Sequence, residues 1–141
     1  MIDHTGLIVS NIEISKKWYA QALKSIGYGI LMEFSAQDVI NSNSGVHVTA
    51  WAGIGEISTQ KPDFWISEAT ATKSATNPPL HIAFRGRRSQ VDQFYKDATA
   101  AGGKDNGKPG LRPHYHPDYY GAFVLDPDGN NIEVVCHDKV E

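Results

Sequence analysis

The sequence of 141 residues has a single cysteine, Cys136, and therefore cannot form a disulfide bond within the chain. This scarcity excludes the class of small, disulfide-stabilised secreted proteins and favours a reducing, cytoplasmic environment. The sequence also lacks any apolar run approaching the roughly 18 residues of a membrane-spanning helix. Asp3 and His4 interrupt the apolar residues at the start, where a secretory signal would need an unbroken run. We therefore expect a cytoplasmic protein with no membrane partner.

An excess of either charge is also absent, because 13 Lys and Arg stand against 16 Asp and Glu, for a net charge of −3. Proteins that bind nucleic acid usually present a basic surface, so no nucleic-acid partner is predicted. The hydrophobic fraction of 40% and the charged fraction of 21% are ordinary for a globular protein. A chain of this length is expected to form one domain, over residues 1–141, with a substantial core.

What the sequence does contain is an approximate internal repeat. His81 follows His4 by 77 positions, and each histidine lies in a β-branched or apolar segment that predicts a strand. An amphipathic segment follows each strand, and Trp18-Tyr19 in the first corresponds to Phe94-Tyr95 in the second, 76 positions later. Two strand-then-helix units that open alike indicate a pseudo-twofold fold that closes around a site.

The repeat predicts two modules, at about residues 1–70 and about 78–141, joined by a linker rich in Ala, Thr and Ser. Before the first helix, Ser10 and Glu13 have the spacing of a capping box, and Ser89 is expected to cap the second helix. The sequence Asp-Pro-Asp-Gly predicts the turn of a closing hairpin. The first module is predicted to contain strands at 2–9, 28–34, 46–51 and 63–67, with a Gly-rich turn between the last two. A weak strand is predicted at 39–40, and a helix at 11–25 that ends at Gly27. The second is predicted to contain strands at 80–84, 120–125 and 131–136, a helix between Ser89 and Gly102, and one short strand with a long loop in 104–118.

Three residues have the chemistry of metal ligands. His4 and His81 recur at the repeat spacing, and Glu133 lies among apolar residues of the last predicted strand. A carboxylate that faces a core is costly unless it is paired or bound to metal. Two histidines and a carboxylate suit a divalent ion with open coordination positions. The alternatives are that the histidines are polar residues near strand starts and that Glu133 faces solvent.

The segment 111–120 carries an unusual number of functional side chains. His114, His116 and Tyr120 are candidate catalytic residues there, and Arg112 and Tyr119 are candidate substrate contacts. Under this interpretation the segment is a pocket wall that supplies hydrogen-bond donors or a general base. The alternatives are a solvated loop held by two prolines, and a second metal-binding pair formed by His114 and His116.

Three motifs resemble the vicinal-oxygen-chelate superfamily, which includes glyoxalase I, extradiol dioxygenases, fosfomycin-resistance thiol transferases and bleomycin-resistance proteins. They are the opening strand and helix over residues 2–19, the strand at 80–84, and the closing hairpin over 126–133. The resemblance covers nearly the whole chain. It implies an α+β fold of two βαβββ modules, with curved mixed sheets that enclose a central cavity. It also implies that His4, His81 and Glu133 hold a divalent metal ion such as Zn, Ni, Mn or Fe.

The sequence departs from the glyoxalase I pattern at one position. Glyoxalase I has a fourth ligand, a carboxylate, on the last strand of the first module. Aligning the two closing strands puts Trp65 opposite Glu133, and Glu68 serves as a ligand only if the register differs by three residues. The site therefore resembles a three-ligand arrangement. Trp51 and Trp65 either line the cavity as substrate contacts or belong to the core.

The resemblance implies a glyoxalase-like enzyme of lyase, isomerase or thiol-transferase type, whose small-molecule substrate chelates the metal through adjacent oxygens. One alternative is a metal-free protein of the bleomycin-resistance type, which binds an aromatic drug. Another is an extradiol-type dioxygenase, which needs Fe or Mn and a site for O₂. In several relatives of this size one cavity takes ligands from two chains, so the resemblance implies a homodimer.

Overall fold

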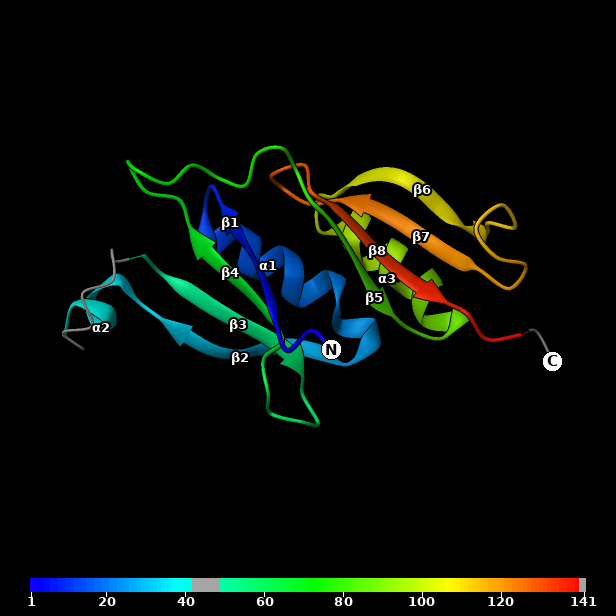
Figure 1. Cartoon of the computed structure of the whole chain (residues 1–141), viewed down its shortest axis with the longest axis horizontal. Helices are drawn as coiled ribbons and strands as arrows, with labels where there is room; N and C mark the ends of the chain where they lie inside the picture. Colours follow the sequence, from blue (N-terminus) through cyan, green and yellow to red (C-terminus); the bar gives the residue numbers. More distant parts are fainter. Residues whose placement is uncertain (42–48, 140–141) are drawn as a thin grey trace.

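The computed structural model describes residues 1–41 and 49–139, and it consists of two modules with the same succession of main elements (Figure 1). Each module has a four-stranded sheet and a long helix, so the predicted α+β fold of two modules is confirmed. The first module contains β1 (Thr5–Val9), α1 (Ile12–Ala22), the short 3₁₀ helix η1 (Lys24–Ile26), β2 (Tyr28–Phe34), α2 (Ala36–Asn41), β3 (Trp51–Glu56) and β4 (Phe64–Glu68). The second contains β5 (His81–Arg85), α3 (Arg88–Ala100), β6 (Lys104–Leu111), β7 (Tyr120–Leu125) and β8 (Asn131–Cys136).

The two sheets have the same topology. Their strand orders are β1-β4-β3-β2 and β5-β8-β7-β6, and in each sheet the first pair is parallel and the others are antiparallel. The sheets lie next to each other and do not close into a barrel (Figure 1). The expected central cavity therefore takes the form of open grooves. Among the described residues, no helix combines the length and the apolar character needed to cross a membrane.

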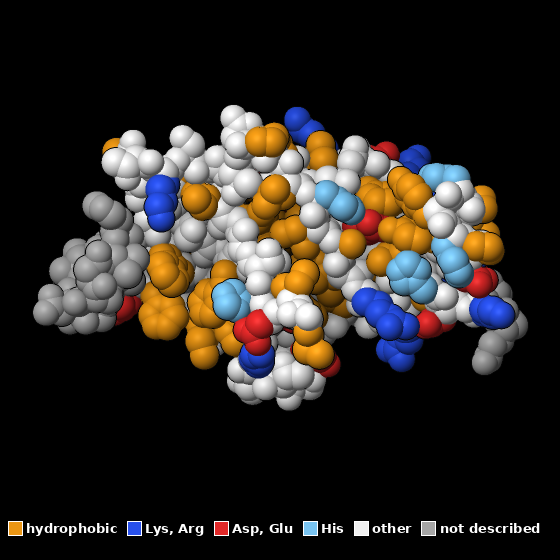
Figure 2. Space-filling model, in the orientation of Figure 1, with side chains coloured by type: hydrophobic (Ala, Val, Ile, Leu, Met, Phe, Trp, Pro, Cys, Tyr) orange, Lys and Arg blue, Asp and Glu red, His pale blue; other side chains and the backbone are white. Residues whose placement is uncertain are grey.

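The core lies between the sheets and the helices α1 and α3. Alternate residues of the strands are buried against the helices, such as Phe64 and Ile66 in β4 and Ile132 and Val134 in β8. The two helices are joined by the indole Nε1 of Trp18, which donates to the carbonyl of Ala98 at 3.1 Å. The opposite side of both sheets, called the open face below, is covered by none of the helices in the described ranges (Figure 1). Figure 2 shows hydrophobic side chains gathered on this side over the strands of the first module.

The helix caps differ from the expected ones by one or two residues. Asn11, not Ser10, caps α1, because its side chain accepts a hydrogen bond from the backbone N–H of Ile14 at 3.0 Å. Ser89 lies inside α3, where Gln90 accepts from the backbone N–H of Arg87 at 2.8 Å. Gly27 ends the first helical region as predicted, with φ of 81° in the left-handed region.

The structure differs from the prediction in the middle of the first module. Val39 and Ile40, predicted to form a weak strand, belong to α2. The predicted strand 46–51 mostly lies outside the described residues, and only its last residue, Trp51, is part of β3. The glycines predicted to form a turn after it, including Gly53, lie inside β3. A Cβ at Gly53 would come within 2.9 Å of the Trp65 ring, so glycine is needed there for close packing.

Residues 104–111 form one long strand, β6, where a short strand and a loop were predicted. Its pairing with β7 is interrupted by bulges on both sides of Gly107, which has φ of 153°. Glycine and proline in the segment suggested a loop, but they are accommodated here because β6 is the edge strand of its sheet.

The turn between β7 and β8 connects the modules. The Asp126 carboxylate accepts hydrogen bonds from the Tyr19 hydroxyl at 2.6 Å and from the backbone N–H of Asn130 at 2.7 Å. The next carboxylate, of Asp128, accepts from the backbone N–H of Ser10 at 3.0 Å and from its hydroxyl. The closing hairpin is thus fixed to the start of α1, which sets the position of β8 relative to the first module.

The linker between the modules follows the outer edge of β1. The backbone N–H of Thr76 donates to the carbonyl of Ile8 at 2.8 Å, and the N–H of Ile8 donates to the Thr76 hydroxyl at 2.9 Å. The linker then leads to β5, where Asn130 accepts from the backbone N–H of Leu80 at 2.9 Å. This contact fixes the chain one residue before His81.

Candidate functional site

His81 and Glu133, two of the predicted ligands, lie side by side on the open face of the second module. His81 is the first residue of β5, and Glu133 is in the middle of the neighbouring strand β8. The imidazole Nε2 of His81 is 3.1 Å from Oε2 of Glu133. The His81 side chain is 50% exposed, whereas Glu133 is only 1% exposed. The buried carboxylate of Glu133 thus contacts a histidine side chain that is itself half exposed to solvent.

The orientation of the His81 ring is set by a backbone contact. Its Nδ1 is 3.0 Å from the carbonyl oxygen of Asn131, which can only accept a hydrogen bond, so Nδ1 carries a proton. In the neutral ring this leaves Nε2 as an acceptor that faces the acceptor Oε2 of Glu133. Two acceptors 3.1 Å apart need a shared proton or a cation between them. The pair therefore has the chemistry of a site for a proton or for a metal ion.

The other oxygen of Glu133 is held by Tyr119. The Tyr119 hydroxyl donates to Oε1 at 2.5 Å. Burial raises the pKa of Tyr119 well above its ordinary value, and the hydrogen bond and negative charge of Glu133 raise it further. Tyr119 therefore stays a hydroxyl donor. Gly121 leaves room for this contact, because a Cβ there would lie 2.9 Å from Oε1.

His4, the third predicted ligand, does not join this pair within one chain. It precedes β1, is exposed, and has its Nδ1 2.9 Å from Asp3. Asp3 also pairs with Lys61 at 2.6 Å, and its hydrogen bonds to His4 and Lys61 lower its pKa to about 2. His4 and His81 do line one groove of about 460 Å³ at the junction of the modules.

His81 and Glu133 are two of the three donors of the predicted metal site. An imidazole and a carboxylate in contact are donors that divalent transition metals accept. Among the residues that the structure describes, however, no three His, Cys, Asp or Glu side chains come close enough to hold an ion. One chain therefore supplies His81 and Glu133 as neighbouring donors, and none of its described His, Cys, Asp or Glu residues joins them as a third.

The residues of the segment 111–120 point in different directions. Tyr119 contacts Glu133, but the Tyr120 hydroxyl donates to Asp92 on α3 at 2.7 Å, on the helix side of the sheet. That hydrogen bond and burial raise the pKa of Tyr120. The Arg112 guanidinium lies over the Phe123 ring, 5.6 Å from its centre, and also donates to the carbonyl of Lys108. Tyr120 is therefore separated from the His81–Glu133 pair, whereas Arg112 lies over Phe123, the residue paired with Glu133 across β7 and β8.

The two predicted catalytic histidines lie in the turn before β7. The ring of His114 packs against Tyr115 at an inclined angle, with centres 4.2 Å apart. His116 accepts from the backbone N–H of Asp118 at 3.2 Å through its Nδ1, and its ring centre is 6.4 Å from that of His137. His137 in turn contacts the ring of Tyr119. The histidines are thus linked to Glu133 through Tyr119, and they make no direct contact with it among the interactions of the described residues.

Trp51 and Trp65 line a groove on the open face of the first module. The groove has a volume of about 930 Å³, and Met32, Leu80 and His4 also line it. Phe34 is paired with Trp51 across β2 and β3, and both side chains are exposed. A large apolar groove with two indoles is a surface suited to a flat apolar ligand.

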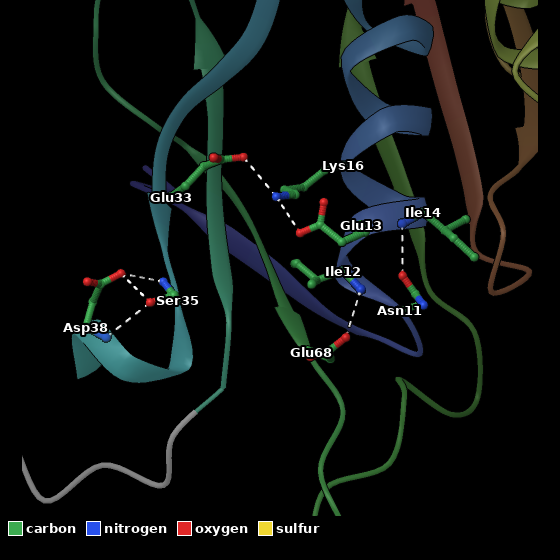
Figure 3. A network of polar contacts seen from close by, with 9 residues as sticks. All are labelled: Asn11, Ile12, Glu13, Ile14, Lys16, Glu33, Ser35, Asp38 and Glu68. Carbon is green, nitrogen blue, oxygen red and sulfur yellow. Dashed lines mark hydrogen bonds and ion pairs between the residues drawn. The ribbon is translucent and has the colours of Figure 1, made fainter. Parts of the chain in front are cut away.

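Glu68, the alternative fourth ligand, is engaged at the start of α1. Its Oε1 accepts a hydrogen bond from the backbone N–H of Ile12 at 3.2 Å, as Figure 3 shows. In the same network Lys16 bridges Glu13 at 2.7 Å and Glu33 at 3.1 Å. A carboxylate at a helix N-terminus stabilises the helix, which is a sufficient structural role for Glu68.

Sequence reasoning missed two residues of the site. Gly121 creates the space for the Glu133 carboxylate, and its signal was a glycine inside a strand, which often marks a close approach. Asn131 orients His81 through its carbonyl oxygen. No side-chain signal identifies a backbone contact of this kind, which depends on the register between β5 and β8.

The comparisons with known proteins agree with this architecture. The family model described as the Glyoxalase/Bleomycin resistance protein/Dioxygenase superfamily matches residues 1–134. A search of curated proteins finds no match.

Solved structures with a similar fold come from several organisms. A glyoxalase/bleomycin resistance protein from Albidiferax ferrireducens is 26% identical, with a TM-score of 0.65 over 96% of this chain and 98% of that chain. A glyoxylase/bleomycin resistance protein/dioxygenase domain from Frankia sp. is 16% identical, with a TM-score of 0.70 over 100% of this chain and 94% of that chain. A glyoxalase I mutant from Zea mays is 21% identical, with a TM-score of 0.70, and the match covers 95% of this chain but only 46% of that chain.

Proposed function

Because the chain belongs to the glyoxalase/bleomycin resistance protein/dioxygenase superfamily, we propose that it is a metal-dependent enzyme acting on a small molecule with two adjacent oxygen donors. The observation that carries the proposal is the contact between His81 and Glu133. Their facing acceptor atoms, Nε2 and Oε2, lie 3.1 Å apart and call for a positive charge between them or beside them. Membership of the family alone leaves the chemistry open, since one fold supports many reactions.

In this proposal His81 and Glu133 hold the ion together. The Asn131 carbonyl keeps the proton on Nδ1 of His81, which leaves Nε2 free to act as a ligand. A bound divalent ion would act as a Lewis acid and stabilise negative charge that develops on a substrate oxygen. His114 and His116 are the proposed proton-transfer groups of the neighbouring turn, whereas the hydroxyl of Tyr120 is engaged by Asp92 on α3.

We further propose that the site is completed in a homodimer, with His4 supplied by a second copy of the chain. His4 is exposed at the rim of an open groove, and Asp3 contacts its Nδ1, so Nε2 is the atom left to reach a metal ion. The apolar side chains Met32, Phe34 and Trp51 are exposed on the open face of the same module. An exposed apolar face of this kind marks an interaction surface.

The test is metal content by elemental analysis. The wild type and the double variant His81→Ala, Glu133→Ala are incubated with Mn, Fe, Ni and Zn salts and then desalted. We expect close to one transition-metal ion per chain in the wild type and loss of the ion in the double variant. His114→Ala is the matched control and should keep the ion. A wild type that retains no metal under any of these conditions would overturn the proposal.

A second candidate function is metal-free binding of a flat aromatic molecule, and the groove lined by Trp51 and Trp65 favours it. Stacking on exposed indoles quenches their fluorescence. Under this candidate, planar aromatic ligands should quench the wild type in the presence of a chelator, and Trp65→Leu should weaken the binding. Binding that requires added metal would favour the enzyme instead.

A further inference from the structure

We propose that Tyr119 is a positioning residue that makes Glu133 a ligand through one oxygen only. The inference rests on the proposed metal site and assigns a role to a residue first considered a substrate contact. The two carboxylate oxygens of Glu133 have different neighbours. Oε1 faces Tyr119 and Gly121, whereas Oε2 faces His81.

The contact with Tyr119 is short and sterically supported. The phenol hydroxyl donates to Oε1 at 2.5 Å, within the range of a charge-assisted O–H···O hydrogen bond. Gly121 lies directly beside Oε1, at a point where a Cβ would come within 2.9 Å of that oxygen and 3.2 Å of the Tyr119 ring. The glycine therefore lets the phenol and the carboxylate meet above β7.

Tyr119 is itself held in place by the turn that precedes β7. Its carbonyl accepts from the backbone N–H of Arg112 at 2.8 Å, and its own N–H donates to the carbonyl of His116 at 3.0 Å. Its ring packs edge-on against Tyr115 and His137, with ring centres 5.1 Å and 5.0 Å away. The hydroxyl thus reaches Glu133 from a fixed backbone and a packed ring, which is what a positioning contact requires.

The chemical consequence concerns the open positions on the ion. A carboxylate that binds through both oxygens takes two coordination positions, whereas one whose second oxygen is held elsewhere takes one. A substrate that chelates through two adjacent oxygens needs two free positions. By keeping Oε1 engaged, Tyr119 leaves Oε2 as the donor and preserves a position for the substrate.

The first test is the affinity for Mn²⁺, measured from the electron paramagnetic resonance signal of the free ion. Tyr119→Phe removes the hydroxyl and keeps the ring. We expect it to weaken Mn²⁺ binding by about 10- to 100-fold, the usual effect of losing a hydrogen bond to a metal ligand. Tyr115→Phe is the matched control, because the Tyr115 ring packs on Tyr119 whereas the hydroxyl that donates to Glu133 belongs to Tyr119, and it should change the affinity less than twofold. Equal affinities of the wild type and Tyr119→Phe would overturn the inference.

The second test works without metal and separates this inference from the proposed function. The ¹⁵N chemical shifts of the His81 ring report its contact with Oε2 of Glu133. In the metal-free protein, Tyr119→Phe should shift the Nε2 signal because the carboxylate is free to turn, and Tyr115→Phe should not. A wild type that binds no Mn²⁺ would overturn the proposed metal-dependent function. An Nε2 signal of His81 that is the same in the wild type and in Tyr119→Phe would overturn the positioning role of Tyr119.

Gly121→Ala provides a variant that keeps the Tyr119 hydroxyl. Its Cβ would displace Oε1, so we expect the same shift of the His81 Nε2 signal as in Tyr119→Phe. Should Tyr119→Phe fold poorly, an unaltered His81 signal in Gly121→Ala would count against the inference.

Discussion

Trp65 occupies in the first module the position that Glu133 occupies in the second. Trp65 is paired with Gly6, two residues after His4, and Glu133 is paired with Ala83, two residues after His81. The internal repeat therefore places an indole on one open face where the other has a buried carboxylate. One half of the molecule offers a polar site and the other an apolar groove.

This correspondence predicts the effect of a carboxylate at position 65. If His4 and the neighbouring strand face the His81–Glu133 pair of a second copy, Trp65→Glu adds a donor to the shared site. We expect Zn²⁺ or Mn²⁺ affinity to rise about tenfold, at the lower end of what single changes around a metal site produce. Calorimetric titration of the ion measures this, with Trp65→Gln as the neutral control. Equal affinities of the Glu and Gln variants would argue against a site completed by the first module.

A second prediction concerns the packing beneath Trp65. A Cβ at Gly53 would come within 2.9 Å of two atoms of the Trp65 ring and 3.0 Å of Pro62. We expect Gly53→Ala to lower the free energy of unfolding by about 1–3 kcal/mol, as overpacking generally does. Urea denaturation measures the loss.

Gly29→Ala is the matched control for this variant, because its Cβ would meet only the flexible end of the exposed Ile57 side chain. The expected change there is below about 0.5 kcal/mol, typical of a surface substitution. Similar losses of unfolding free energy in both variants would mean that the loss comes from the change in backbone freedom and not from contact with Trp65.

The third prediction concerns stability at alkaline pH. Burial raises the pKa of Tyr19 well above its ordinary value of 10.0, and the charge of Asp126 adds to the effect. Tyr19 stays protonated in the folded protein, whereas it ionises near pH 10 in the unfolded chain. Its contribution is therefore complete below pH 10 and is lost progressively as the pH rises above that value.

Tyr19→Phe isolates this contribution. At neutral pH we expect it to cost about 1.5–3 kcal/mol, the range for a hydrogen bond to a charged group. The difference in free energy of unfolding between wild type and variant should narrow between pH 9 and pH 11, as followed by urea denaturation at each pH. A difference that stays constant over this range would contradict the assigned pKa shift.

The parts of the fold that were predicted correctly depend on local signals. Gly27 ends a helix because its conformation is left-handed, and the Asp-Pro-Asp-Gly turn joins β7 and β8. The errors arose where distant contacts decide the structure. Gly53 was assigned to a turn because nothing in the local sequence reveals that Trp65 packs across it. The edge strand β6 was missed for the same reason, since its pairing with β7 overrides its glycine and proline content.

The residues of the candidate site could likewise be predicted in part only. The repeat and the resemblance selected His81 and Glu133, which the structure brings into contact. They could not indicate that His4 would pair with Asp3, because that contact depends on how the chain enters β1. The hydrogen bond from Tyr119 to Glu133 was equally hidden, since it joins residues whose distance is set by a turn and a strand register.

The linker residue Thr76 also bears on how copies of the chain meet. Its hydrogen bonds to both backbone groups of Ile8 occupy the donor and acceptor that a foreign strand would use at that point of β1. A foreign strand could pair with β1 there only after the linker detached. The linker therefore protects this edge of the sheet against edge-to-edge aggregation. In the homodimer proposed above, the contact between the two copies would therefore have to avoid this part of the β1 edge, unless the linker moves.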